Sequence, residues 1–254
     1  MFKKLFFTLV ICLFIKTNAQ DGTVSPYSYF GLGTFNPANT VENNAMGGLS
    51  IYGDSIHVNL QNPASYGLLK LTTYTVGVSH RRMALTSDTQ EKSTALTAID
   101  YLSVAMPIAE NIGIGFGITP VTSMGYILNS SAENANGETI TNVFSGDGGL
   151  SKIYFSLGAA PIKNFTVGAS AFANFGTVNK ERVQSLSSVL FGTIDRRTSR
   201  MNGFNFQMAA NYTPNITDKL TLYTSFVHTT GLDLKASNTQ QVGSLSLVNG
   251  SELE

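Results

Sequence analysis

The chain has few charges, a single cysteine and only one long apolar run. Among its 254 residues 13% are charged, against about 25% in typical soluble domains. The 16 basic and 16 acidic residues balance, and no basic stripe is present that would bind nucleic acid. The only cysteine, Cys12, lies in the apolar run near the N-terminus. The rest of the chain therefore has no disulfide and no thiol chemistry.

The first nineteen residues have the pattern of a secretory signal peptide. Lys3 and Lys4 precede the apolar run 5–15, and the small residue Ala19 stands before the expected cleavage point. The run is shorter than the roughly 20 residues of a spanning helix, and the order of basic, apolar and small residues is that of an exported protein. We expect residues 1–19 to be cleaved, with a retained anchor as the alternative. Loss of their three lysines leaves 13 basic and 16 acidic residues.

An exported chain of this composition is typical of a transmembrane β-barrel. It is rich in glycine, with 24 residues, and in phenylalanine and tyrosine, with 16 and 10. No stretch after residue 19 reaches the length of an apolar spanning helix. The mean hydropathy is close to neutral, as expected when strands alternate between a lipid face and a wet face. A soluble β-sandwich, which also alternates, is the alternative.

Residues 204–212 show this alternation most clearly. Side chains two apart in a strand share a face of the sheet. One face is expected to carry Phe204, Phe206, Met208, Ala210 and Tyr212, and the other Asn205, Gln207, Ala209 and Asn211. An apolar outer face and an amide-lined inner face are what a strand between lipid and a wet lumen requires. Residues 165–171 and 220–226 repeat the pattern.

Connection lengths favour the barrel over the sandwich. Three tight connections follow strands and carry Pro107, Pro161 and Pro214, whereas the polar stretches 81–97, 122–149 and 177–200 are long. Outer-membrane barrels have short periplasmic turns and long outer loops. The predicted strands are 71–80, 99–106, 111–120, 150–160, 164–177, 199–212 and 219–232, with a further start near 242 and a hairpin of 124–130 with 138–145 above the membrane.

Seven strands by residue 234 do not close a bacterial barrel, which needs an even number. Residues 249–254 read as a polar loop rather than as a terminal aromatic strand. We therefore expect residues 71–254 to form a partial barrel, the front portion of a longer one. A small eight-stranded barrel with a frayed last strand is the alternative.

Residues 20–70 precede the strands and lack strong periodicity. They are rich in glycine, asparagine, proline and serine, and fifty such residues are too many for a simple connection. The segment is expected to be either a periplasmic tail or a hatch folded into the lumen, where its polar backbone meets polar walls. Asn62, Pro63 and Ala64 are the candidate hatch or lumen residues, although Asn-Pro followed by serine also favours a plain turn.

Short motifs in this region resemble known outer-membrane proteins. Residues 25–33, Ser-Pro-Tyr-Ser-Tyr-Phe-Gly-Leu-Gly, resemble the mature start of a group of Bacteroidetes outer-membrane proteins. Residues 45–48, Ala-Met-Gly-Gly, with 62–65, Asn-Pro-Ala-Ser, resemble the N-terminal hatch of the FadL/TodX family of hydrophobic-compound transporters. Residues 146–150 also recur in that group. The similarity covers residues 25 to about 180, and it implies a fourteen-stranded barrel with its hatch in the lumen.

The chemistry of catalytic or metal sites is not indicated. Gly113-Ile114-Gly115-Phe116-Gly117 lies inside a strand with no helix after it, so we interpret it as small residues on one barrel face rather than a dinucleotide loop. His57, His80 and His228 lie far apart without a carboxylate cluster, which does not favour a metal site. No nucleophile elbow is present, so we expect neither an enzyme nor a cofactor.

The function expected from the resemblance is passive transport of small hydrophobic compounds across the outer membrane. The alternative is a barrel that moves no solute and serves as a structural or plug component of a secretion or surface-assembly complex. Outer-membrane lipids and lipopolysaccharide are the expected partners. Candidate contacts to lipopolysaccharide phosphates, by charge-assisted hydrogen bonds, are Arg81, Arg82, Arg196, Arg197 and Arg200.

Overall fold

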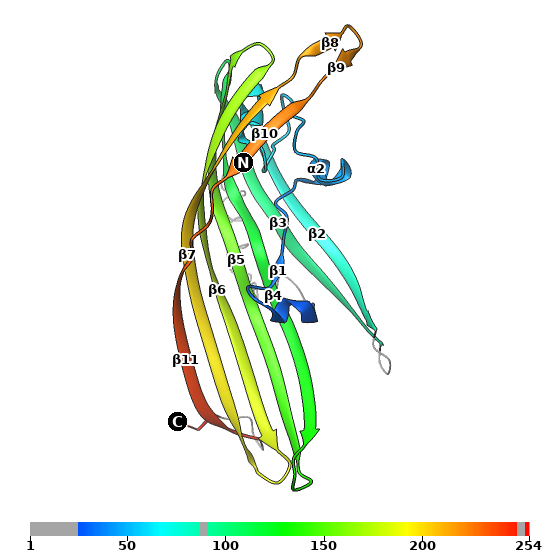
Figure 1. Ribbon diagram of the computed structural model, residues 1–254, viewed down its shortest axis with the longest axis vertical. Coiled ribbons are helices and arrows are strands. Elements are labelled where there is room, and N and C mark those ends of the chain that lie inside the picture. Colours follow the sequence, from blue (N-terminus) through cyan, green and yellow to red (C-terminus); the bar gives the residue numbers. More distant parts are fainter. Residues whose placement is uncertain (1–24, 87–90, 248–251, 254) are drawn as a thin grey trace, which may run out of the picture.

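The computed structural model describes residues 25–86, 91–247 and 252–253. In these ranges the chain forms one large antiparallel sheet that curls into a half barrel, with the N-terminal segment inside the curve (Figure 1). The predicted all-β, antiparallel barrel-type fold is confirmed. The expected signal peptide, residues 1–19, lies outside the described residues.

Most strands pair with their neighbours in chain order. This order needs only hairpin connections, the simplest antiparallel topology. Beginning at one edge, the strands are β2 (Thr73–Thr86), β3 (Glu91–Ala109), β4 (Ile112–Glu133), β5 (Thr139–Ile162), β6 (Phe165–Leu186) and β7 (Phe191–Tyr212), followed by β10 (Thr224–Thr229) and β11 (Lys235–Ser246), which both pair with β7, and by β12 (Glu252–Leu253) on β11.

The two faces of β7 are those that the sequence predicts. Phe204 and Met208 are 72% and 65% exposed, whereas Gln207 and Asn211 are 9% and 4% exposed. Neighbouring strands continue the exposed face into an outer apolar band, whose members include Tyr74, Val76, Ile112, Phe116, Phe155, Leu157, Phe206, Met208 and Phe226. An apolar surface with members on five strands is far larger than soluble monomers expose. It fits hydrocarbon on the outside of the sheet.

The strands are much longer than predicted. β4, β5, β6 and β7 contain 22, 24, 22 and 22 residues, although about 9–11 are enough to cross a membrane. The prediction of long outer loops is therefore wrong, because most of the three polar stretches belongs to strands. Residues 134–138 and 187–190 are the actual connections between β4 and β5 and between β6 and β7. The predicted hairpin of 124–130 with 138–145 is confirmed as the far end of β4 and β5.

The opposite end of the sheet carries the short turns. Glu110–Asn111 joins β3 to β4, and Lys163–Asn164 joins β5 to β6. Asn164 has a φ of 64°, a left-handed conformation that asparagine tolerates. The third predicted tight connection is wrong. There the chain makes an extra hairpin of β8 (Asn215–Thr217) and β9 (Leu220–Thr221), so that the strand predicted from 219 begins at Thr224.

The last long strand of the sheet is interrupted. β10 and β11 pair with the two halves of β7, and residues 231–234 leave the sheet between them. Leu232 and Leu234 in this interruption pack against the cluster Met124, Tyr126, Leu150, Val178 and Met201 on the inner face. The predicted strand start near 242 is therefore too late, since β11 begins at Lys235.

The N-terminal segment, defined here as residues 25–69, holds short elements only. These are η1 (Pro26–Tyr29), β1 (Thr34–Phe35), α2 (Val41–Ala45) and η2 (Pro63–Leu68). In the described part of the chain, no helix combines the length and apolar character needed to cross a membrane. Because the segment has little regular structure of its own, its position depends on contacts with the sheet.

Candidate functional site: the inner face and the N-terminal segment

A row of small residues on the inner face receives η2. Gly113, Gly158, Gly168 and Ala209 stand opposite one another in β4, β5, β6 and β7. A Cβ atom on Gly168 would lie 2.3 Å from the carbonyl carbon of Pro63, and one on Gly158 would lie 2.5 Å from the Pro63 oxygen. The backbone of η2 thus lies directly on the backbone of the sheet. We call these four residues the glycine row.

The Tyr66 side chain also holds η2 against the sheet. Its ring covers Gly115, where a Cβ would lie 2.0 Å from the ring carbon Cε1. The side chain is 2% exposed and belongs to a buried cluster with Leu69, Tyr101 and Tyr154. Burial of an aromatic side chain contributes about 1.5–3 kcal/mol. The sequence-based interpretation of residues 113–117 as a strand with small residues on one face is confirmed.

Asn62 connects η2 to β7 and β10 through hydrogen bonds. Its Nδ2 group donates to Asn211 Oδ1 at 2.9 Å, to Ser225 Oγ at 3.0 Å and to the Ser50 carbonyl at 3.2 Å. Its Oδ1 accepts from the Ala64 amide at 3.1 Å, which caps the helix. The candidate residues Asn62 and Ala64 have no exposed surface, and Pro63 is likewise fully buried. Their role as hatch residues stays a prediction.

We expect Asn62→Ala to loosen the N-terminal segment. The substitution leaves Asn211 Oδ1 and the Ala64 amide buried without this partner, at a cost of about 1–3 kcal/mol each. The measurement is the rate of limited proteolysis within residues 25–69 of the membrane-embedded protein, which should rise. Asn44→Ala, at an exposed position of α2, is the control and should leave the rate unchanged. Equal rates in both variants would contradict the assigned role of Asn62.

The residues after Ser25 dock on the far half of the sheet. The Ser28 hydroxyl accepts from the Gly125 amide at 3.1 Å and donates to the Ser25 carbonyl at 2.7 Å. The Tyr29 ring packs edge-on against Tyr126, with ring centroids 5.2 Å apart. The Lys180 ammonium donates to the carbonyls of Tyr29 and Gly31, both at 3.3 Å. The motif 25–33 therefore serves as a contact surface for β4, β5 and β6.

β1 lies along the part of β4 that β3 leaves. β3 pairs with β4 only as far as Leu102 opposite Ile118, and an irregularity follows at Pro120. Beyond it, Thr34 and Phe35 pair with Ser123 and Thr122. Figure 1 shows the β2–β3 hairpin diverging from β4 at this point. We call the region between the diverging β3 and β4 the seam.

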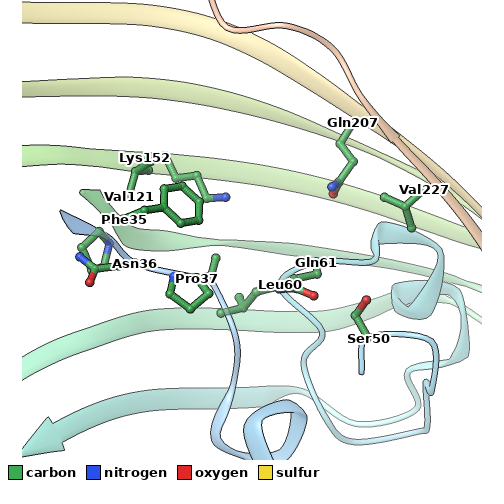
Figure 2. Close-up of a pocket in the computed structure, with 12 residues that line it drawn as sticks. Phe35, Asn36, Pro37, Ser50, Leu60, Gln61, Val121, Lys152, Gln207 and Val227 are labelled. Carbon is green, nitrogen blue, oxygen red and sulfur yellow. The ribbon is translucent and has the colours of Figure 1, made fainter. Parts of the chain in front are cut away.

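A cavity of about 380 Å³ lies between part of the N-terminal segment and the sheet. Asn36, Pro37, Ser50, Leu60 and Gln61 form one wall, and Val121, Lys152, Gln207 and Val227 form the other (Figure 2). The cavity is large enough for a small molecule. Its lining includes one ammonium group and several amides, so it suits a polar ligand or part of one.

A second cavity, of about 310 Å³, lies between α2 and the turn at residues 52–59. Asp54 organises this turn by accepting from the amides of Ile56 and His57 at 2.9 and 2.7 Å, and its other oxygen lies 2.5 Å from His57 Nδ1. Partial burial alone would raise the pKa of Asp54, but the hydrogen bonds from His57 and Ile56 outweigh it and hold the pKa below 3.8.

We expect the 54–57 turn to open in acid. The lowered pKa of Asp54 means that the folded carboxylate binds a proton less readily than the unfolded one, so its stabilisation is present above the unfolded value near 3.8 and is lost as the pH falls through the folded value. Hydrogen-exchange protection of the Ile56 and His57 amides, followed from neutral to acid pH, should fall accordingly. The same fall in Asp54→Asn would contradict this explanation.

The five arginines proposed to contact lipopolysaccharide do not form one cluster. Three have carboxylate partners, at 3.4, 2.9 and 2.9 Å: Arg81 with Asp100, Arg196 with Glu181, and Arg197 with Asp195. Arg82 and Arg200 are exposed. Neighbouring side chains alternate between faces of a strand, so Arg196 and Arg197 cannot serve the same surface. Their contact with lipopolysaccharide stays a prediction.

Sequence reasoning missed the glycine row and the pair Lys152 and Gln207. The glycine row depends on strand register, which places residues far apart in the chain on one level of the sheet. Lys152 and Gln207 lie at different levels, and only the folded sheet and N-terminal segment bring them to one cavity. A partial signal was present for the row, since Gly113, Gly158 and Gly168 lie in strands where glycine is otherwise unfavourable. Lys152 was also visible as a charge among residues 150–160, a segment expected to cross the membrane.

An apolar outer band and an inner face covered by the chain's own N-terminal segment define an outer-membrane type of β-barrel protein. A family model described as BamG matches residues 1–254. The chain therefore belongs to the BamG family, which is related to outer-membrane β-barrels. Comparison with curated proteins and with solved structures gives no match. The resemblance to FadL/TodX transporters stays a prediction.

Proposed function

We propose that this protein is a plugged outer-membrane barrel that acts as a component of an assembly complex rather than as an open channel. The observation that carries the proposal is the fit of η2 on the glycine row. Backbone lies on backbone at Gly158 and Gly168, and Asn62 adds buried hydrogen bonds to β7 and β10. Contacts of this kind cannot open and close without a large cost, which favours a permanent plug. Membership of the BamG family supports a link to assembly machinery.

The proposal includes export and membrane contacts. Residues 1–19 would act as a cleaved signal peptide, and the outer apolar band would contact lipid. On β7 the exposed Arg200, together with Arg196, would lie near lipopolysaccharide phosphates, because residues at even positions share the face of Phe204 and Phe206. Arg197 would face inward with Asp195.

Purification of the tagged, full-length protein from its native membrane tests the proposal. We expect stoichiometric recovery with large subunits of an assembly complex after mild detergent extraction. The purified protein in planar bilayers should show no steady ion conductance. Recovery alone, combined with steady conductance, would contradict the proposal.

Uptake of small hydrophobic compounds is the second candidate function. The seam favours it, because β4 pairs there with the short strand β1 in place of β3, and a solute in the outer leaflet would meet this point from the side. The short hatch-like motifs 45–48 and 62–65 support it further. Uptake by liposomes containing the full-length protein should exceed that of empty liposomes, and equal uptake would contradict this candidate.

A further inference from the structure

Lys152 is an unusual residue for the inner face of β5. Its ammonium group lies 4.6 Å from the centroid of the Phe172 ring, and among the described residues no carboxylate lies within ion-pair distance of it. Cation–π contact contributes only about 0.5–2 kcal/mol. Partial removal of an ammonium group from water costs more than that unless an anion or several acceptors replace the water. The arrangement therefore favours a missing anionic partner.

Gln207 lies on the same cavity and is also incompletely paired. It is 9% exposed, its Nε2 group donates to Thr229 Oγ1 at 3.0 Å, and its Oε1 atom is buried without a hydrogen-bond partner among the described residues. The oxygen and nitrogen of a side-chain amide are interchangeable by rotation. After such a rotation the Thr229 hydroxyl donates to Oε1, and the NH₂ group is left without an acceptor among the described residues.

The Lys152 and Gln207 side chains both line the cavity between the N-terminal segment and the sheet. Figure 2 shows the Lys152 and Gln207 side chains extending from their strands toward the wall that holds Ser50 and Gln61. A ligand group held between them would meet one positive charge and one amide donor. The cavity of about 380 Å³ has room for a headgroup-sized molecule.

We propose that this cavity binds an oxyanion group, a phosphate or a carboxylate, through the Lys152 ammonium and the Gln207 amide. Hydrogen bonds between charged partners are about twice as strong as neutral ones, and the anion supplies the charge that Lys152 lacks. The group belongs either to a free small anion or to a lipid headgroup. Its site does not depend on the proposed role in an assembly complex.

Binding of the anion stabilises the docked N-terminal segment. One wall of the cavity belongs to that segment and the other to β4, β5, β7 and β10, so a ligand binds well only when the two are together. A ligand that binds only the docked form raises the stability of that form by mass action. Thermal unfolding and proteolysis of residues 25–69 therefore report on occupancy.

The test uses the full-length protein in neutral detergent. Sodium phosphate and sodium acetate are each titrated against sodium chloride at constant ionic strength, and a parallel arm compares nanodiscs of phosphatidylglycerol with nanodiscs of phosphatidylcholine. We expect phosphate, acetate or phosphatidylglycerol to raise the unfolding temperature and to slow proteolysis of residues 25–69. Stabilisation by the free anions indicates a soluble ligand, and stabilisation by phosphatidylglycerol alone indicates a headgroup.

Matched variants assign the effect to the site. Lys152→Met should weaken the apparent affinity about tenfold or more, and Gln207→Leu should weaken it less. Lys152→Arg keeps the positive charge and should retain binding, which would show that position 152 tolerates substitution. Lys219→Met, which removes an exposed lysine between β8 and β9, is the control and should bind as the unmodified protein does. No stabilisation in any arm, or equal stabilisation in Lys152→Met, would overturn the proposal.

Discussion

Replacing Gly168 by valine should release the N-terminal segment from the sheet and make the barrel conduct ions. Any Cβ at this position would lie 2.3 Å from the Pro63 carbonyl carbon and 2.5 Å from the Ala64 nitrogen. Both neighbours are backbone atoms of η2, so no side-chain rotation relieves the clash. Overpacking of a fixed site costs about 1–3 kcal/mol or more, and displacement of η2 is the least costly relief because β6 is held by strands on both sides.

The measurement is single-channel conductance of the full-length protein, together with proteolysis of residues 25–69. The Gly168→Val variant should conduct steadily and lose protection of the segment. Ala169→Val is the matched control, because Ala169 is the next residue of β6 and is exposed on the opposite face. A silent, fully protected Gly168→Val protein would show that η2 does not close the barrel.

The second large effect is expected on the outside of β7. Phe206 is 54% exposed within the outer apolar band, so Phe206→Arg places a charge in hydrocarbon. Such substitutions on the lipid face of a barrel cost about 2–4 kcal/mol near the midplane. The free energy of unfolding in lipid vesicles should fall by this amount, and assembly into the outer membrane should decrease.

Asn205→Arg is the control for this effect. Asn205 precedes Phe206 and points to the inner face, where its Oδ1 atom accepts from Asn174 Nδ2 at 2.8 Å. An arginine there keeps its charge away from lipid, so the loss of stability should be clearly smaller. Equal losses from the two substitutions would mean that both faces of β7 have the same surroundings.

The sequence predicted the faces of the strands better than their lengths. Alternation from Phe204 to Tyr212 identifies the apolar outer face and the amide-lined inner face, because apolar surroundings exclude polar side chains from one face of the strand. Beyond that region both faces are wet, and residues such as Glu181 and Arg196 carry no alternation. Backbone pairing nevertheless continues, with Glu181 opposite Arg196. The alternation of hydropathy therefore indicates which part of a strand crosses the membrane, but it does not indicate where the strand ends.

The inner site was predictable only in part. Asn62, Pro63 and Ala64 were identified as a turn or hatch element because local chemistry marks them. Their surroundings were not, since the glycine row requires the register that places Gly113 opposite Gly158 and Gly168. That Lys152 and Gln207 line the same cavity likewise depends on the order of β5, β6 and β7. The sequence alone identifies these residues, but it does not show which residues of other strands lie beside them.

A scan of single cysteines along residues 204–212 tests the central claim, that hydrocarbon surrounds this sheet, most directly. Cys12 is the only native cysteine, so a Cys12→Ser background leaves each introduced residue as the sole thiol for a spin label. In lipid vesicles, labels at 204, 206, 208, 210 and 212 should be accessible to oxygen and protected from a water-soluble nickel reagent. Labels at 205, 207, 209 and 211 should show the reverse preference or little access to either reagent. Access of the nickel reagent to both sets alike, without a period of two residues, would contradict the account.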